Sequence, residues 1–242
     1  MTAPTDIGLL ELGEVDYGRA LALQYELRNR LGNDGAPENR AGFLLALEHP
    51  PVVTLGKRGE TDALLRRDRL RERGVDLYEI DRGGEATYHG PGQLVLYPIL
   101  KLAALELGVV DVVRGLARIV ADKLGNLGIA AAYDEDHPGL WTSSPRAKIA
   151  SVGMRVKRGI TTHGAAINLT NDLAPFDHIV ACGMPDARAT RVVDHTDADD
   201  LGPISFARRL YGDLEELLDA PLVDADVDLP APDQRIEPSE AL

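Results

Sequence analysis

The stretch "KIASVGMRVKRGITTHGAAINL", residues 148–169, decides the fold of this chain. It holds two strand-like runs joined around Lys157-Arg158-Gly159, which is the pattern of a β-hairpin. Both runs contain small residues, namely Ser151, Gly153, Gly164, Ala165 and Ala166. Small residues on paired strands leave a groove that larger side chains would fill, although close packing of a helix over the sheet is a common alternative reason. The stretch therefore predicts a hairpin with a candidate binding surface along it.

Further elements follow outward from this hairpin. Strands are predicted within residues 42–56, 75–80 and 93–100, and helices within residues 16–31, 62–73, 111–125 and about 204–218. Asp16 and Asp111 are the expected N-caps of their helices. The inward residues expected on the 111–125 helix are Val113, Leu116, Val120 and Leu124. Because most neighbouring strands are joined by short connections, the pattern favours an α/β fold of the α+β kind: a mixed, largely antiparallel sheet flanked by helices, not a doubly wound parallel sheet.

Charge is spread unevenly over the 242 residues. The formal net charge of −13 argues against a general nucleic-acid-binding surface, so we expect no nucleic acid partner. Residues 219–242 carry seven acids, one base and four prolines, and we expect them to form a disordered acidic tail after a single domain of residues 1–218. Residues 57–73 carry seven bases against four acids, which indicates either a solvated helix face or a docking patch for an acidic partner.

Targeting, membrane and metal signals are missing from the sequence. The start lacks a basic region followed by an apolar one, and no apolar run approaches the roughly 18–20 residues that span a bilayer. We therefore expect a cytoplasmic protein without a membrane partner. Cys182 is the one cysteine, so an internal disulfide and a cysteine-based zinc site are excluded, and we expect no metal and no bound cofactor.

A second unusual stretch is "DRGGEATYHGPGQLVLYPIL", residues 81–100, a glycine-rich loop that runs into a strand. Glycines let backbone N–H groups approach a ligand closely. Arg82 could hold an anionic or carbonyl-bearing group, and Tyr88 and His89 could wall a pocket. A loop between two strands, with His89 as a structural hydrogen bonder, explains the same residues equally well. No Gly-Lys-Ser/Thr follows and no helix follows, so the loop is neither a P-loop nor a dinucleotide fingerprint.

Cys182 and Lys148 could form an acyl-transfer pair. A free thiol with a pKa of about 8.5 is only a few per cent thiolate at neutral pH, and an ammonium nearby would raise that fraction. The cysteine would take the acyl group as a thioester, and the lysine would act as acid or base for the incoming amine. The alternatives are a small buried hydrophobe for Cys182 and a solvated strand-edge guard for Lys148.

Five segments stand together in a fixed order over roughly residues 43 to 186. They are "EHPPVVTLG", "RGGEATYHGPGQLVLYPIL", "KIASVGMRV", "THGAAINL" and "ACGMPD". In this order and spacing they resemble the lipoate-protein octanoyltransferases, also called lipoyl(octanoyl) transferases. The resemblance implies a fold similar to the catalytic domains of biotin- and lipoate-protein ligases. It also implies octanoyl transfer from octanoyl-acyl carrier protein to a specific lysine of lipoyl domains, in 2-oxoacid dehydrogenase complexes and the glycine cleavage H protein, as the first step of making protein-bound lipoate.

The resemblance also implies roles for individual residues. Carried over by position, Cys182 is the acyl-thioester nucleophile and Lys148 is its partner. The implied substrate-binding residues are Arg82, Gly83, Gly84, Glu85, Ala86, Thr87, Tyr88 and His89, then Ser151, Val152 and Gly153, then Gly164, Ala165 and Ala166. Whether His89 or His163 shares the proton transfers stays open.

Two departures and two alternatives accompany the resemblance. Many members have proline where Ala181 stands, and many have leucine or phenylalanine where Ala165 stands, so a wider acyl tunnel and an altered chain-length preference are open. An ATP-dependent lipoate- or biotin-protein ligase of the same fold is the nearest alternative, but it needs phosphate contacts and no nucleophilic cysteine. A non-catalytic acyl- or lipoyl-domain-binding module is the other, and it would tolerate loss of the thiol.

Overall fold

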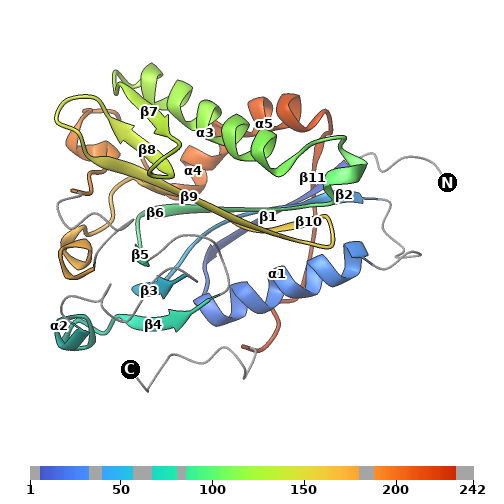
Figure 1. Cartoon of the computed structure of the whole chain (residues 1–242), viewed down its shortest axis with the longest axis horizontal. Coiled ribbons are helices and arrows are strands. Elements are labelled where there is room, and N and C mark those ends of the chain that lie inside the picture. The colour runs from blue at the N-terminus through green and yellow to red at the C-terminus, as the bar shows by residue number, and fades with distance from the viewer. Residues whose placement is uncertain (1–5, 33–39, 57–66, 81–85, 180–187, 233–242) are drawn as a thin grey trace.

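The computed structural model describes residues 6–32, 40–56, 67–80, 86–179 and 188–232, and Figure 1 shows their arrangement. Eight strands form one large sheet in the order β11-β1-β2-β6-β10-β9-β8-β7. They are β1 (Asp6–Glu14), β2 (Arg40–Glu48), β6 (Gln93–Leu100), β7 (Ala131–Asp134), β8 (Gly139–Thr142), β9 (Lys148–Lys157), β10 (Ile160–Asn168) and β11 (Leu222–Asp224). The β11–β1 and β1–β2 pairs are parallel, and every other neighbouring pair is antiparallel. The predicted mixed, largely antiparallel sheet is confirmed.

A second sheet of three strands lies beside the large one, in the order β4-β3-β5. Its strands are β3 (Val52–Leu55), β4 (Asp76–Glu79) and β5 (Ala86–His89). Pro50 and Pro51 separate β2 from β3, because a proline cannot donate to a strand ladder. The predicted strands within residues 42–56, 75–80 and 93–100 are therefore present as β2 with β3, β4 and β6.

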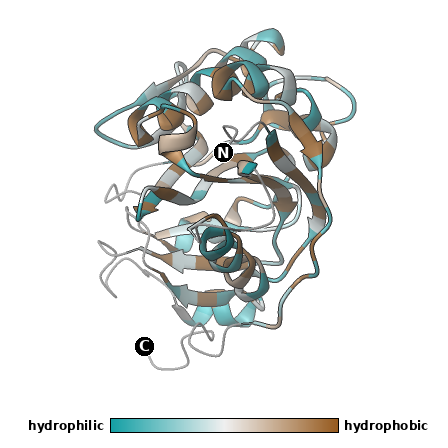
Figure 2. Ribbon diagram, turned by 90° about the vertical axis from the view of Figure 1, so that its right-hand side faces the viewer, coloured by the Kyte–Doolittle hydropathy of each residue, from teal (hydrophilic) through white to brown (hydrophobic). Residues whose placement is uncertain are grey.

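Helices cover both faces of the large sheet (Figures 1 and 2), and hydrophobic residues run along the strands between these layers. The helices are α1 (Tyr17–Gly32) on one face, α3 (Val109–Asn126), α4 (Pro203–Arg208) and α5 (Tyr211–Leu218) on the other, and the short α2 (Arg67–Glu72) beside the small sheet. Each covered face has its own buried cluster. One gathers under α3, α4 and α5, and the other gathers between the sheet and α1. Within the described ranges, no helix combines the length and apolar character needed to cross a membrane.

The hairpin of residues 148–169 forms as predicted, from β9 and β10. Ile160 pairs with Lys157, so the loop has two residues, Arg158 and Gly159. Both have positive φ, 54° and 75°, as a type I′ turn requires. Along the strands the small residues lie opposite one another, with Gly164 paired to Gly153, Ala165 to Val152 and Ala166 to Ser151.

Two of the helix predictions need correction. The helix predicted over 111–125 begins at Val109, and Asp111 is not its N-cap; its carboxylate accepts the N–H of Gly108 from inside the first turn, at 2.9 Å. The single helix expected near 204–218 is two helices, because the chain turns at Arg209 and Leu210. Residues 62–66 of the expected basic helix lie outside the described residues. The 16–31 helix is confirmed, with the Asp16 carboxylate accepting the N–H of Arg19 at 3.0 Å.

The expected disordered tail is wrong for residues 222–232. Leu222 to Asp224 form β11, which pairs with β1 and covers the edge of the sheet. Val227 and Leu229 then pack against the α1 cluster. The Arg19 guanidinium donates to the carbonyl oxygens of Leu229 and Pro230, both at 3.1 Å. Residues 233–242 lie outside the described residues.

Candidate functional site

The two faces of the large sheet have different character. The α3 cluster takes Leu94, Leu96, Ala165 and Ile167 from the adjacent strands β6 and β10. Because side chains alternate along a strand, the residues between them point to the opposite side. Those residues are Gln93, Val95, Ala166 and Asn168, and Val95 and Ala166 belong to the α1 cluster. We call this second side, which is turned toward α1 and the small sheet, the site face.

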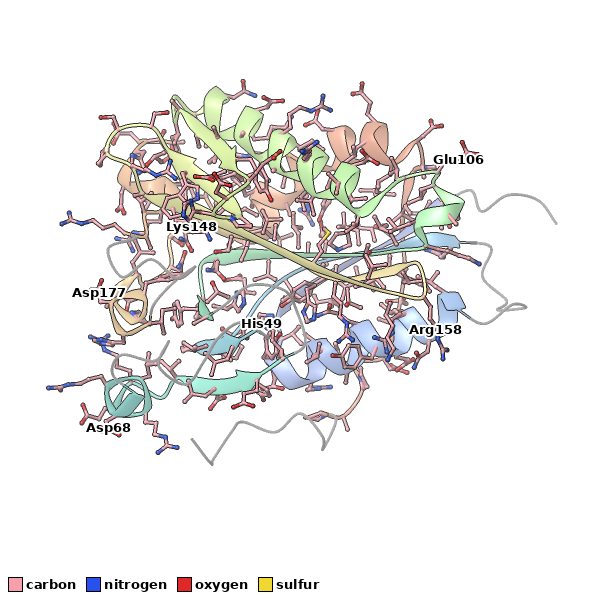
Figure 3. The ribbon with its side chains drawn as sticks, in the orientation of Figure 1. His49, Asp68, Glu106, Lys148, Arg158 and Asp177 are labelled. Atoms are coloured by element: carbon pink, nitrogen blue, oxygen red, sulfur yellow. The ribbon has the colours of Figure 1, made fainter. Side chains whose placement is uncertain are left out.

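A β-bulge turns Lys148 onto the site face. The register between β8 and β9 shifts at this point, with Leu140 opposite Ala150 and Trp141 opposite Lys148. Ile149 is the extra residue, and both Ile149 and Ala150 are buried in the α3 cluster. The alternation of side chains therefore reverses at the bulge, as bulges commonly re-aim a side chain. Lys148 and Trp141 share the side opposite to α3, and Lys148 is 7% exposed. Figure 3 labels Lys148 at this end of the sheet.

The backbone of Lys148 holds the segment that follows the position of Cys182. The Lys148 N–H donates to the carbonyl of Arg188 at 2.8 Å, and the N–H of Thr190 donates to the carbonyl of Lys148 at 2.9 Å. Ala189 thus forms a parallel bridge with Lys148. On the preceding side, Ile179 is buried in the cluster of the small sheet. Cys182 lies outside the described residues.

A chain of buried polar side chains crosses the site face. The Gln93 side chain lies 2.7 Å from Nδ1 of His89 through its Oε1, and its Nε2 donates to Oδ1 of Asn168 at 2.8 Å. Nδ2 of Asn168 donates to the carbonyl of Thr190 at 3.0 Å. Gln93 and Asn168 are 1% and 4% exposed, so their hydrogen bonds are shielded from bulk solvent. The chain connects His89 on the small sheet with the residues bridged to Lys148.

Sequence reasoning missed Gln93, Asn168 and Thr190 as site residues. The sequence contained a signal for two of these residues, Gln93 and Asn168. Gln93 opens the apolar run "QLVLYPIL" and Asn168 nearly closes "GAAINL", and a polar residue at the end of a buried strand needs a partner inside the protein.

A cluster of aromatic rings lies behind His89. The His49 ring is 5.6 Å from the His89 ring, and the Tyr17 ring is 6.2 Å from it and stacked. Full burial lowers the pKa of His49 to about 4, so its imidazole is neutral at neutral pH. Nδ1 of His49 then donates to the carbonyl of Val15 at 2.7 Å, and Nε2 accepts from the hydroxyl of Tyr97 at 2.8 Å. These bonds fix the wall against which His89 packs.

The residues predicted on β9 and β10 divide between the two faces. Ser151 and Gly153 lie on the site face and are partly exposed, whereas the residues around Ser151 are buried. Val152 and Ala165 have their side chains in the α3 cluster, so a smaller residue at 165 does not widen a tunnel on the site face. Ala166 lies on the site face. A Cβ at Gly164 would lie 2.0 Å from the Leu96 carbonyl oxygen, so close packing of β6 explains that glycine.

The residues predicted on β5 also divide. Ala86 and Tyr88 pack in the cluster of the small sheet, where burial raises the pKa of Tyr88 to about 12. Thr87 and His89 are directed to the other side by alternation, and His89 reaches the polar chain. His163 is buried with φ 60°, and its backbone N–H donates to Oε1 of Gln24 at 2.7 Å. Arg82, Gly83, Gly84 and Glu85 lie outside the described residues.

From the sequence we expected no metal site, and such a site would need several ligating side chains close together. In the part of the chain that the structure describes, no three His, Cys, Asp or Glu side chains gather in a way that could hold a metal ion.

The fold and this site define the class of protein. The structure of lipoate-protein ligase A bound with ATP superimposes with a TM-score of 0.71 over 92% of this chain and 90% of that chain, at 18% identity. The biotin protein ligase of Aquifex aeolicus in complex with biotin and ATP gives a TM-score of 0.51 over 88% and 70%, at 15% identity. The predicted fold of biotin- and lipoate-protein ligase catalytic domains is therefore confirmed.

Sequence similarity gives the family within that class. Residues 16–211 match the lipoyl protein ligase A/B catalytic domain. An octanoyltransferase of Acidobacterium capsulatum is 40% identical over 201 residues, 76% of this chain and 78% of the relative. Octanoyltransferases of Desulfotalea psychrophila and Pseudomonas fluorescens are 37% and 36% identical, over 86% and 89% of this chain and 92% and 94% of theirs. This chain belongs to the octanoyltransferase family. It is an acyltransferase of protein lipoylation, as the resemblance implied.

Proposed function

We propose that the chain takes an octanoyl group from octanoyl-acyl carrier protein, holds it as a thioester on Cys182, and delivers it to a lysine of a lipoyl domain. Family membership supports the octanoyl transfer. A solved structure of related fold supports the acceptor, since it is that of a lipoate protein ligase of Thermoplasma acidophilum and its E2 lipoyl domain. We infer one catalytic domain for residues 1–218, with residues 222–232 packed onto it, acting in the cytoplasm.

Two acyl transfers complete the proposed reaction. The Cys182 thiolate attacks the carbonyl carbon of the donor thioester, the bond to the carrier sulfur breaks, and that sulfur leaves and takes a proton. The amine of the acceptor lysine then attacks the Cys182 thioester, forming the amide as the bond to Cys182 breaks. Lys148 gives and takes the proton that these steps require. The balance is one thioester and one amine converted to one amide and one thiol, with no oxidant and no nucleotide.

One observation carries the pairing of Lys148 with Cys182. The bulge at Ile149 turns Lys148 onto the site face, and the same residue bridges Ala189. Cys182 precedes Ala189 by seven residues, and seven extended residues reach at most about 25 Å. The bridge to Ala189 therefore limits how far Cys182 can lie from Lys148. The Asn168 side chain, which donates to the Thr190 carbonyl, also holds the segment that follows Cys182 in the sequence.

Intact-mass measurement tests this function. After incubation with octanoyl carrier protein, the wild-type chain should gain one octanoyl group, and hydroxylamine should remove it. Cys182→Ser should not form a hydroxylamine-sensitive adduct, and Cys182→Ala is the matched control without an oxygen nucleophile. A stable hydroxylamine-sensitive adduct on Cys182→Ala would sink the assignment of the nucleophile. Transfer to a lipoyl domain should proceed without ATP, and a strict need for ATP would favour a ligase.

A further inference from the structure

We infer that Trp141, Gly139 and the carbonyl group of Pro138 form a cradle that fixes the direction of the Lys148 side chain, so that Trp141 and Gly139 are positioning residues of acyl transfer. This inference rests on the proposed role of Lys148. It concerns residues that neither the sequence motifs nor the family resemblance singled out.

The indole of Trp141 provides one wall of the cradle. Nζ of Lys148 lies 5.5 Å from the centroid of its ring, from the directly opposite position on β9. An ammonium within about 6 Å of an indole face is attracted to it, and the attraction is stronger where water is excluded. Trp141 is 4% exposed, and its Nε1 donates to the carbonyl of His137 at 2.9 Å, so the ring itself is held in place. The Arg146 guanidinium also contacts this ring, at 4.8 Å, and is paired with Asp134.

The strand start before Trp141 provides the other two parts. Nζ of Lys148 donates to the carbonyl oxygen of Pro138 at 2.9 Å. Gly139 has φ 148°, and a Cβ there would lie 2.4 Å from Cε of Lys148 and 2.5 Å from the carbonyl oxygen of Ala150. The methylene stem of Lys148 therefore occupies the space that any side chain at 139 would take.

Lysine is a flexible point charge, and its value as a proton carrier depends on where its ammonium is held. The bulge at Ile149 selects the face on which Lys148 lies. The cradle then selects one direction on that face, through the Pro138 carbonyl, the Trp141 ring and the space left free at Gly139.

The single tryptophan of the chain makes the contact measurable without activity. Fluorescence emission of Trp141 at a fixed pH should differ between wild type and Lys148→Met. It should be unchanged in Lys157→Met, which removes an exposed ammonium from the far end of β9. Identical spectra for wild type and Lys148→Met would overturn the cradle.

Kinetics of octanoyl transfer test its consequence. Trp141→Leu should lower kcat about tenfold with little change in KM, and Trp141→Phe should retain most of kcat because it keeps an aromatic face. Gly139→Ala should lower kcat at least as much. Gly128→Ala is its control, because that glycine also has positive φ, 79°, but open space around it. Thermal unfolding checks that each variant folds, and the Lys148→Met spectrum does not depend on the other variants.

The outcomes separate the cradle from the proposed function. Loss of transfer in Lys148→Met together with full kcat in Trp141→Leu and Gly139→Ala would overturn the cradle and leave the proposed function standing. Full transfer in Lys148→Met would overturn both the cradle and the proposed role of Lys148, and would leave the octanoyl transfer itself standing. Equal losses in Trp141→Phe and Trp141→Leu, with folding intact, would also contradict an aromatic wall.

Discussion

The two ends of the β9–β10 hairpin are made of the same two strands and have opposite character. At the start of β9, Lys148 is buried and bonded through its backbone and its side chain. At the turn, Lys157, Arg158 and Gly159 are exposed, and Arg155 and Arg158 are close enough to Arg28 for their charges to help lower its pKa, after the larger effect of burial. Figure 3 shows Lys148 and Arg158 at opposite ends of the sheet.

The two ends of the hairpin therefore have different expected roles: the buried end takes part in the reaction, and the turn carries surface charge. A ten-residue strand spans about 33 Å, so the turn lies far from Lys148. At the buried end, Lys148 is held by hydrogen-bond partners, whereas the turn carries basic side chains that contact solvent. Substitutions at the buried end should therefore alter the reaction or the stability, and substitutions at the turn should alter only encounter with a charged partner.

The largest effect is expected at Lys148. Lys148→Ala should slow transfer by about 100-fold or more, because it removes the proposed acid and base, and it should raise the pH at which iodoacetamide alkylates Cys182. Lys148→Arg keeps the charge but does not deprotonate, so it should preserve part of the alkylation profile and still lose transfer. Unchanged alkylation in both variants would reduce Lys148 to a structural residue.

A stability effect is expected from His49 in the ring cluster. Its folded-state pKa is about 4, below the ordinary 6.5, so the unfolded chain takes up a proton between these values that the folded chain refuses. The stabilisation is fully present above pH 6.5 and is lost as the pH falls toward 4, by roughly 3 kcal/mol. Urea unfolding at pH 7 and pH 4.5 should show a steeper loss for wild type than for His49→Gln. Parallel losses in the two proteins would contradict a buried neutral imidazole.

A smaller effect is expected at Asn168. Asn168→Asp keeps the shape but replaces the donor to the Thr190 carbonyl by an oxygen, which leaves a buried carbonyl unpaired at a cost of about 1–3 kcal/mol. Loosening the residues bridged to Lys148 should lower kcat about tenfold with a small octanoyl thioester as donor. Asn171→Asp is the matched control, since Asn171 donates to Asn168 but not to Thr190. A larger loss in the control would place the effect in general packing.

The smallest effect is expected at the turn. Combined Arg155→Glu and Lys157→Glu should raise KM for octanoyl carrier protein about threefold or less and leave the small thioester unaffected, since charges of partly or fully exposed side chains act on association and are screened over about 8–10 Å. Arg188→Glu, which is exposed beside Lys148, is the comparison. A stronger carrier effect at the turn than at Arg188 would break the contrast between the two ends. The basic run of residues 57–73 is the other possible docking patch. Its Arg66 lies outside the described residues, and its Arg69 is paired with Glu72.

The sequence predicted the regular parts of the fold. Periodicity and turn residues predicted α1, the strands of both sheets that were named, and a hairpin that turns around Lys157-Arg158-Gly159, because each depends on neighbouring residues alone. The break between α4 and α5 was missed, since the apolar period continues through Arg209 and Leu210.

The sequence could not predict what depends on pairing between strands. The bulge at Ile149 exists only in the register between β8 and β9, so the face on which Lys148 lies could not be derived from its own strand. The polar chain from His89 to Thr190 joins residues from four segments. The end of the chain was a different failure: after β11, the apolar Ala225, Val227 and Leu229 alternate with acids and pack against the α1 cluster, and the acidic composition obscured this alternation.

The pairing of β11 with β1 has a consequence for biosynthesis. Because β1 is synthesised long before β11, the β1 edge of the large sheet has no strand partner from its own chain until Leu222–Asp224 have been made. At about 5–20 residues per second, that interval is on the order of 10–40 seconds. A ribosome-bound chain thus exposes a strand edge that can join another polypeptide, and the last strand, short as it is, ends that exposure.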